Sequence, residues 1–175
     1  MVTTRRTAAV QRPIEDTEAL IDHLMPMLSH QLSNDVSNIY FGDVGVYLPS
    51  HFLGPRKEQR AVLALSPAYD RLEQRVASQE TRLIGVDIIG LINITPYFEA
   101  SPKEAYGERQ LASLMRKIRV FLSQQEHVQL DGRVQYFDVG DISWNWMQRK
   151  NLSLRGAALE VTARVKVSRM KNSTP

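Results

Sequence analysis

The chain has 175 residues, no cysteine and a net charge of +3. This length suits one domain with one sizeable core. The lack of cysteine excludes disulfides and thiolate metal sites and is typical of proteins that fold in a reducing compartment, so we expect a cytoplasmic protein. No window approaches the roughly 18 apolar residues of a membrane span, and no apolar segment follows the N-terminal arginines, so we expect neither membrane insertion nor secretion.

The charge is unevenly distributed along the chain. Residues 1–12 carry three arginines and no acidic residue, residues 13–132 have a net charge of −5, and residues 133–175 have a net charge of +5. We interpret 1–12 and 170–175 as flexible tails around a domain that spans 13–169. Basic ends could neutralise the phosphates of a nucleic acid. Alternatively, they are solvated, or they pair with the acidic body of a neighbouring subunit.

A leading amphipathic helix is expected from about Pro13 to Ser33. Pro13 suits a first-turn position, and the acidic residues that follow it suit the positive end of the helix dipole. Pro26 removes an internal hydrogen bond and should kink the helix or split it into two pieces. Six apolar residues recur near helical spacing in this segment: Ile14, Leu20, Ile21, Leu24, Leu28 and Leu32.

Two strands joined as a hairpin are expected next. Residues 39–48 are rich in aromatic and β-branched types but are interrupted by two glycines, which indicates a bent or bulged strand. The polar segment 54–60 separates this strand from the apolar run 61–65, which is bounded by Pro67 and is expected to be a buried strand. We therefore predict a hairpin with a charged tip.

The segment 68–79 is mostly polar and is the least regular part of the pattern. Its apolar residues Tyr69, Leu72 and Val76 recur at spacings of three and four, so it could form a short helix or an extended loop. Connections of this length without regular structure are uncommon unless they are functional. The longest apolar strand follows at 82–94, with apolar residues at both parities, so both of its faces should be covered.

A second helix has the clearest start signal in the sequence. Ser101 is the expected N-cap, Pro102 takes the first helical position and Glu104 completes a capping box. We expect the helix to lie on a sheet and to end near Gln124. Its apolar stripe comprises Leu111, Leu114, Met115, Ile118, Phe121 and Leu122.

Two further strands complete the pattern. Asp131-Gly132 marks a turn into a strand whose inward-facing parity changes, which indicates a bulge at Gly140-Asp141. The last strand alternates apolar and polar residues and should have one buried and one solvated face. The order helix, strands, helix, strands predicts a single α+β domain, with a mostly antiparallel β-sheet and two main helices packed on it.

The sequence carries no recognisable catalytic or metal motif, so we expect neither enzyme activity nor a cofactor. His23 and His30 are roughly 10 Å apart along the first helix, too far to share one metal unless the chain folds back at Pro26. Residues 42–45 lack the lysine and hydroxyl residue that follow the glycines of a phosphate-binding loop. Three glutamates precede an arginine by two residues, and we interpret them as solvated strand or loop edges: Glu58, Glu73 and Glu80.

Seven residues are candidates for a subunit interface. Trp144 and Trp146 share a strand parity, and large aromatic side chains are enriched at subunit contacts, although both residues fit a core equally well. The other five lie in the segment 68–79, which could reach a neighbour: Tyr69, Arg71, Leu72, Arg75 and Val76.

Three features follow one another from Glu108 onward. They are the helix ERQLASLMRKIRVFL, a strand that ends near an aspartate in VQLDGRVQYFDVGDISW, and the closing strand LSLRGAALEVTARVKV. This order resembles small bacteriophage structural proteins of the tail terminator and neck (head-tail joining) group. The leading helix and the strand at 85–94 fit as well, so the likeness covers most of the chain.

The resemblance implies a non-enzymatic virion protein of the tail or neck, assembled in the host cytoplasm. Subunits would form a hexameric ring that caps the tail tube, stops its polymerisation and presents a surface to the head connector. DNA would pass through the lumen without sequence-specific binding. The implied partners are other copies of the chain, the tail tube protein and neck proteins, without a membrane. The alternative is a nucleic-acid-binding or regulatory module that uses its basic ends.

Overall fold

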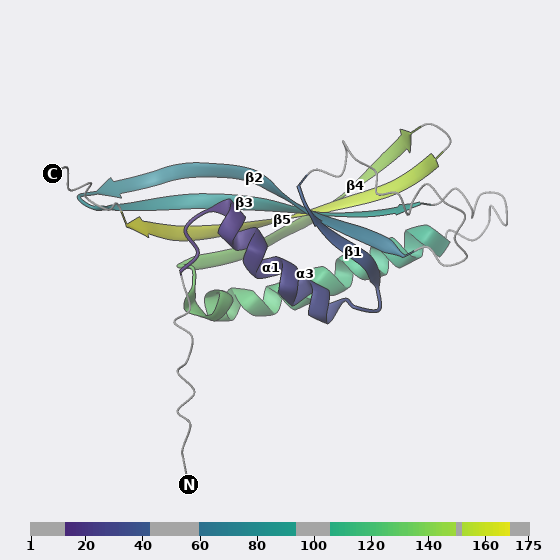
Figure 1. Ribbon diagram of the computed structural model, residues 1–175, viewed down its shortest axis with the longest axis horizontal. Coiled ribbons are helices and arrows are strands. Elements are labelled where there is room, and N and C mark those ends of the chain that lie inside the picture. The colour runs from purple at the N-terminus through teal and green to yellow at the C-terminus, as the bar shows by residue number, and fades with distance from the viewer. Residues whose placement is uncertain (1–12, 43–59, 94–105, 150–151, 169–175) are drawn as a thin grey trace, which may run out of the picture.

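Five strands form one sheet in the computed structural model, which describes residues 13–42, 60–93, 106–149 and 152–168. Both helices lie against the same face of this sheet (Figure 1). The expected α+β fold, a mostly antiparallel sheet with two helices packed on it, is confirmed. In chain order the elements are α1 (Thr17–Gln31), β1 (Val36–Phe41), β2 (Ala61–Val76), β3 (Gln79–Asn93), α3 (Tyr106–Gly132), β4 (Tyr136–Arg149) and β5 (Leu152–Ser168).

The strands lie side by side in the order β1-β2-β3-β5-β4. All neighbours are antiparallel except β1 and β2, which are parallel. The predicted hairpin between 39–48 and 61–65 is therefore wrong. The connection from Phe41 to Ala61 is long enough for a parallel crossing, which needs about a dozen residues or more. Its expected charged tip, 54–60, lies outside the described residues except for Arg60, which is exposed.

The segment 68–79 is neither a helix nor a loop, because it forms the end of β2 and the turn into β3. β2 continues past Pro67, where a bulge between Pro67 and Tyr69 accommodates a residue that cannot donate a ladder hydrogen bond. A second register shift lies between Leu72 and Gln74. These two irregularities break the strict alternation of side chains along the strand. The apolar residues Tyr69, Leu72 and Val76 are therefore spaced by three and four, as they would be in a helix.

α1 is one continuous helix that contains Pro26. It begins at Thr17 and not at Pro13, because Asp16 caps it: the Asp16 Oδ1 atom accepts a hydrogen bond from the Ala19 N–H at 2.7 Å. Pro26 is exposed, so the carbonyl that loses its hydrogen bond lies on the solvated side. The predicted split into two pieces is therefore wrong.

α3 continues beyond the predicted end at Gln124. Gln129, Leu130 and Asp131 have left-handed φ angles of 51°, 51° and 59° and end the helix with the expected turn before Gly132. The Val139 N–H donates to Glu126 Oε1 at 2.9 Å, which fastens this last part of the helix to β4. The expected capping box at 101–104 lies outside the described residues.

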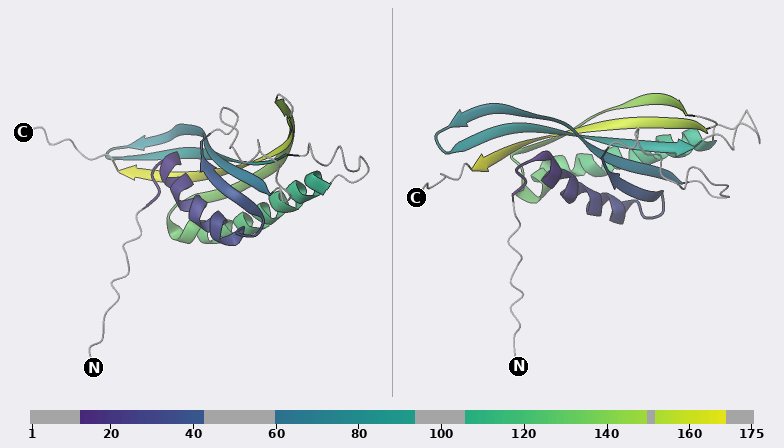
Figure 2. Two further views of the ribbon diagram at one scale, coloured as in Figure 1. Left: turned by 45° about the vertical axis from the view of Figure 1, so that its right-hand side comes forward. Right: turned by 45° about the horizontal axis from the view of Figure 1, so that its top comes forward.

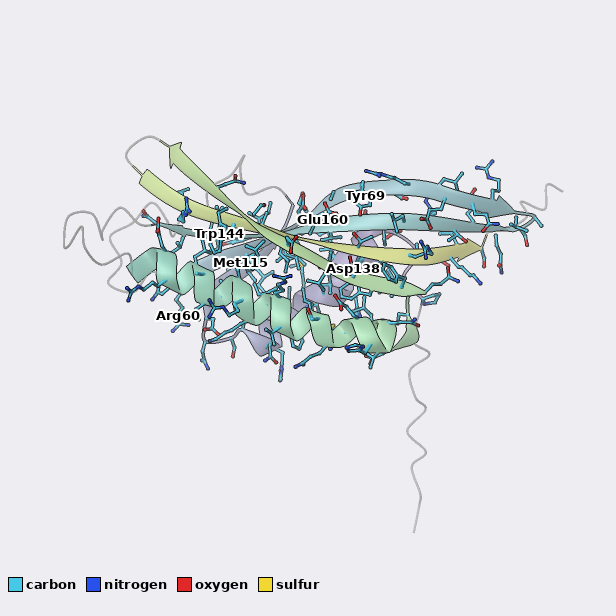
Figure 3. The ribbon with its side chains drawn as sticks, turned by 180° about the vertical axis from the view of Figure 1, so that it is seen from behind. Arg60, Tyr69, Met115, Asp138, Trp144 and Glu160 are labelled. Atoms are coloured by element: carbon cyan, nitrogen blue, oxygen red, sulfur yellow. The ribbon has the colours of Figure 1, made fainter. Side chains whose placement is uncertain are left out.

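The core lies between the two helices and the sheet. Met115 faces the sheet from α3 (Figure 3), and a Cβ at Gly90 would be only 2.9 Å from its sulfur, so glycine permits the close approach of α3 to β3. The bulge predicted at Gly140-Asp141 is confirmed by a register shift between Val139 and Ile142. In β5 the expected alternation holds from Leu159 onward, since Leu159, Val161, Ala163 and Val165 are buried and Val167 is partly buried.

The face of β3 turned toward the helices is buried along most of its length. On the other side of the sheet, Leu91 is buried in a small cluster with Val62 and Ala64, whereas Leu83 and Ile89 are only partly buried. The expectation that both faces of 82–94 are covered therefore holds fully on one side and partly on the other.

Three strands continue beyond the helices as a projecting part of the sheet, shown from three directions in Figures 1 and 2. We call residues 70–76 of β2, 79–83 of β3 and 164–168 of β5 the wing. We call the face of the sheet turned away from the helices the open face. The proposed tails, 1–12 and 170–175, lie outside the described residues.

Candidate functional site

A chain of ion pairs stiffens the wing on its helix-facing side. Arg82 donates from Nε to Asp70 Oδ1 at 2.7 Å and from Nη1 to Glu80 Oε2 at 3.2 Å, and Arg75 Nη2 lies 3.0 Å from Glu80 Oε1. The Asp70 hydrogen bond, followed by the contribution of Glu80, raises the pKa of Arg82. Glu80 is only 5% exposed, so the interpretation of this residue as a solvated edge is wrong.

The open face of the wing is held by side chains that reach from β2 to β5 across β3. The Tyr69 hydroxyl donates to Glu160 Oε1 at 3.3 Å and hydrogen-bonds Thr162 Oγ1 at 2.7 Å. Arg164 donates from Nε to Glu73 Oε2 at 2.6 Å and from Nη2 to Oε1 at 3.3 Å, and this hydrogen bonding lowers the pKa of Glu73. Glu73 is therefore at an edge, as predicted, but it holds two strands together.

An acidic area continues along the open face beside these contacts. Asp87 and Glu160 are direct cross-strand partners, and Asp138 is the partner of Thr162 on β4. Partial burial, and then the charge of Glu160, raise the pKa of Asp87. Within the described ranges, no three histidine, aspartate or glutamate side chains are grouped so that they could hold a metal ion.

A groove of about 490 Å³ lies between α3 and β4, and we call it the α3–β4 groove. Two large apolar side chains are exposed there, Val120 at 57% and Trp144 at 42%. The guanidinium of Arg155 lies 5.9 Å from the Trp144 ring centre. The groove is lined by Ala112, Arg116, Arg119, Val120, Ser123, Ile142 and Trp144.

The seven predicted interface residues fall into two separate groups. Five lie along β2, from Tyr69 at the base of the wing to Val76 at its tip, and Trp144 lies in the α3–β4 groove far from that tip (Figure 3). Of the two readings left open for Trp144, its exposure excludes the core. Trp146 is in register with Arg155, but its side chain lies outside what the structure describes.

Within the wing, the five residues differ in what they contact. The guanidinium of Arg71 lies 4.6 Å from the Tyr69 ring centre, and Arg75 belongs to the ion-pair chain. Leu72 and Val76 are exposed at 46% and 58%. Leu72 is the cross-strand partner of Arg82 and Val76 that of Gln79, so the braced wing presents one exposed apolar side chain on each of its faces.

Sequence reasoning missed the buried Glu80 and its partners, because the wing was not recognised as paired strand. It also missed the α3–β4 groove. A signal for the groove was present, since Ala112, Arg116, Val120 and Ser123 recur at spacings of four and three on one face of the predicted helix.

The histidines of α1 form no common site. His23, in the middle of the helix, is half-buried, with Nδ1 at 3.0 Å from Arg133 Nη1, whereas His30 is exposed in the last turn. Across the described ranges, no helix has the length and apolar character that crossing a membrane requires. No protein-family model matches the chain, and no curated protein matches it.

Proposed function

We propose that this protein is a non-enzymatic virion assembly protein of the tail terminator or neck group. Its subunits form a ring that caps the tail tube and joins it to the head connector, and DNA passes through the lumen without sequence-specific binding. The proposal starts from the resemblance in the second half of the chain, and the arrangement of exposed surfaces supports it.

One observation carries most weight: exposed apolar side chains lie at the two ends of one long, braced sheet. The wing presents Leu72 and Val76, and the α3–β4 groove presents Val120 and Trp144. A subunit with separate contact surfaces can bind a neighbouring subunit through one surface and another tail component through the other, as a capping ring built from head-to-tail contacts requires. Aromatic and apolar side chains supply most of the binding energy at such contacts.

The polar groups of the wing support the same function. In a catalytic site, perturbed side chains line a cleft with room for a substrate. Here Asp70, Glu80 and Arg82 are tied to one another, and Tyr69 is tied to Glu160, so these groups fix the position of three strands. A rigid arm loses little conformational entropy when it binds a partner.

The first experiment is native mass spectrometry of the full chain, with negative-stain images of the same sample, at low and moderate salt. A closed six-fold ring with a central hole is the expected result. The reversal Arg71→Glu with Arg75→Glu tests the wing, and we expect it to prevent docking on purified tail tubes. Rings and docking that are unchanged in this variant would count against the role of the wing.

The nucleic-acid alternative predicts a different outcome. A monomer that shifts the mobility of DNA, with affinity that falls steeply as salt rises, would replace the assembly function with a nucleic-acid-binding one. Of the basic ends on which that alternative depends, 1–12 lies outside the described residues, whereas most of 133–175 is described as β4 and β5.

A further inference from the structure

The α3–β4 groove combines exposed apolar surface with positive charge. Arg116 and Arg119 lie on its α3 wall beside Val120, and Trp144 lies on its β4 wall. Within the described ranges Arg116 has no ion pair, and Arg119 has one at 3.2 Å to Asp141, whose side chain is 97% exposed. An ion pair this exposed contributes little to stability, so Arg119 can leave Asp141 for a carboxylate of a binding partner. The groove therefore suits an acidic surface that also carries an apolar group.

The outer face of α1 has the complementary character. Glu18 and Asp22 are exposed and point away from the buried residues of the helix, and Glu15, also exposed, comes just before the N-cap Asp16. None of the three has an ion pair among the described residues. Pro26 follows Asp22 by four on the same face and is exposed, so it supplies an apolar ring next to the carboxylates.

These two surfaces lie over opposite edges of the sheet, although Arg116 and Val120 also border the end of α1 at Gln31, Leu32 and Asp35. α1 packs against β1 and β2, at one edge of the sheet, whereas α3 packs mainly against β4 and β5, at the other edge. Figure 1 shows α1 in front of α3, and Figure 3 shows the opposite side, with α3 and β4 toward the viewer. One copy therefore cannot bring its own two surfaces together, but successive copies can.

We infer that the α3–β4 groove binds the acidic outer face of α1 from a second copy of this chain. The contact is head-to-tail: each subunit uses α1 toward one neighbour and the groove toward the other. Arg116 and Arg119 face Glu18 and Asp22 of the next subunit, and Trp144 packs near its Pro26. Repetition of such a contact closes a ring if the rotation between subunits allows it. This inference rests on the proposed function and names the surfaces that build the ring.

Charge reversal tests the contact, with the full chain and native mass spectrometry over a concentration series. Arg116→Glu alone and Asp22→Lys alone should each raise the concentration needed for assembly by about tenfold or more, because like charges then face each other. The double variant Arg116→Glu/Asp22→Lys restores opposite charges in one chain and should assemble within about threefold of the unmodified protein. A mixture of the two single variants should also assemble, with the two chains alternating.

Two matched controls change the net charge by the same amounts elsewhere. Lys166→Glu and Asp138→Lys alter exposed residues of the open face and should leave assembly unchanged. Thermal unfolding of every variant shows whether it is folded. Rings that persist in both single reversals, or a double variant that fails to assemble although it is folded, would overturn this inference and leave the proposed ring intact. An unmodified chain that stays monomeric at every concentration and salt tested, and on tail tubes, would overturn the proposed function itself.

Discussion

The ring of Tyr69 lies directly across Gly85, so that a Cβ at Gly85 would be 2.5 Å from the Tyr69 Cε1 atom. Tyr69 belongs to β2, Gly85 to β3, and the hydroxyl of Tyr69 reaches Thr162 on β5. Because Gly85 has no side chain, Tyr69 of β2 can pass over β3 and hydrogen-bond to β5. Three strands of the wing are thereby fixed at its base by one aromatic side chain.

Gly85→Ala should lower the free energy of unfolding by about 1–3 kcal/mol, because the new methyl group displaces the Tyr69 ring. Urea unfolding monitored by circular dichroism measures this change. In a Tyr69→Ala background the same substitution should cost much less, since the space is then free. The comparison variant is Gly156→Ala, whose Cβ would be 3.0 Å from the end of the flexible Leu91 side chain. Equal costs in both backgrounds would show that the ring is not the cause.

Glu80→Ala should loosen the wing. Glu80 is 5% exposed and is held by Arg75 and Arg82, so its removal leaves two guanidinium groups without their shared carboxylate. We expect a loss of about 1–3 kcal/mol and faster amide hydrogen exchange in 70–76 and 79–83. Glu108→Ala is the control, because the Glu108–Arg155 ion pair is long, at 3.7 Å, and the Glu108 side chain is 41% exposed. Unchanged exchange rates in the wing would contradict the bracing role of Glu80.

His23 should make the stability of the fold depend on pH. Burial, and then the charge of Arg133, lower the pKa of His23, while Asp131 acts in the opposite direction. The unfolded chain binds the proton at the ordinary pKa near 6.5, so the folded form binds it less readily. The contribution to stability is therefore complete above that value and is lost as the pH falls through the lower pKa of the folded state.

Urea titrations across roughly pH 7.5 to 5 measure this dependence. His23→Gln should flatten the curve in that range, whereas His30→Gln, at an exposed position of the same helix, should leave it unchanged. If the free energy of unfolding of His23→Gln varied with pH as steeply as that of the unmodified protein, other groups would be responsible for the pH dependence.

Asp87→Asn should stabilise the protein at neutral pH. The pKa of Asp87 is raised by burial and then by Glu160, so the folded chain holds the proton more tightly than the unfolded chain does. The charged form of Asp87 therefore lowers the free energy of unfolding, and this destabilisation disappears as the pH falls through the raised pKa of the folded state. The urea midpoint should rise in the Asn variant at pH 7, and by less at acidic pH. Asp138→Asn, at an exposed position of the open face, is the control; an equal rise there would point to net charge alone.

The parts of the fold that the sequence predicts are those with an uninterrupted period. The alternation of Leu159, Val161, Ala163 and Val165 and the apolar stripe of α3 identify the buried faces correctly, because each face contacts one continuous core. The bulge at Gly140 could be predicted since it shifts the inward-facing parity. Local composition therefore identifies an element wherever packing repeats along it.

The wing and the direction of β1 could not be predicted for physical reasons. A proline usually ends a strand, but here a bulge accommodates Pro67 within β2. The exposed residues beyond Pro67 show no alternation of apolar and polar types. Glu80 is hidden by arginines rather than by apolar neighbours, so its burial leaves no hydrophobic signal. The direction of β1 depends on which strand it joins, and an apolar segment gives no sign of that. The α3–β4 groove combines residues of two elements that only the fold brings together.

The place of β5 between β3 and β4 determines the order in which the fold can form. The β2–β3 hairpin closes through a short turn and can form as soon as Asn93 has left the ribosome. The centre of the sheet can form only when the last strand, β5, has been made. Even the closest β3–β5 pair, Asn93 and Leu154, is separated by all of α3 and β4. Such distant contacts are formed slowly. A chain truncated before β5 would thus keep the hairpin, lose the only strand that β4 pairs with among the described residues, and leave the long edge of β3 exposed to aggregation.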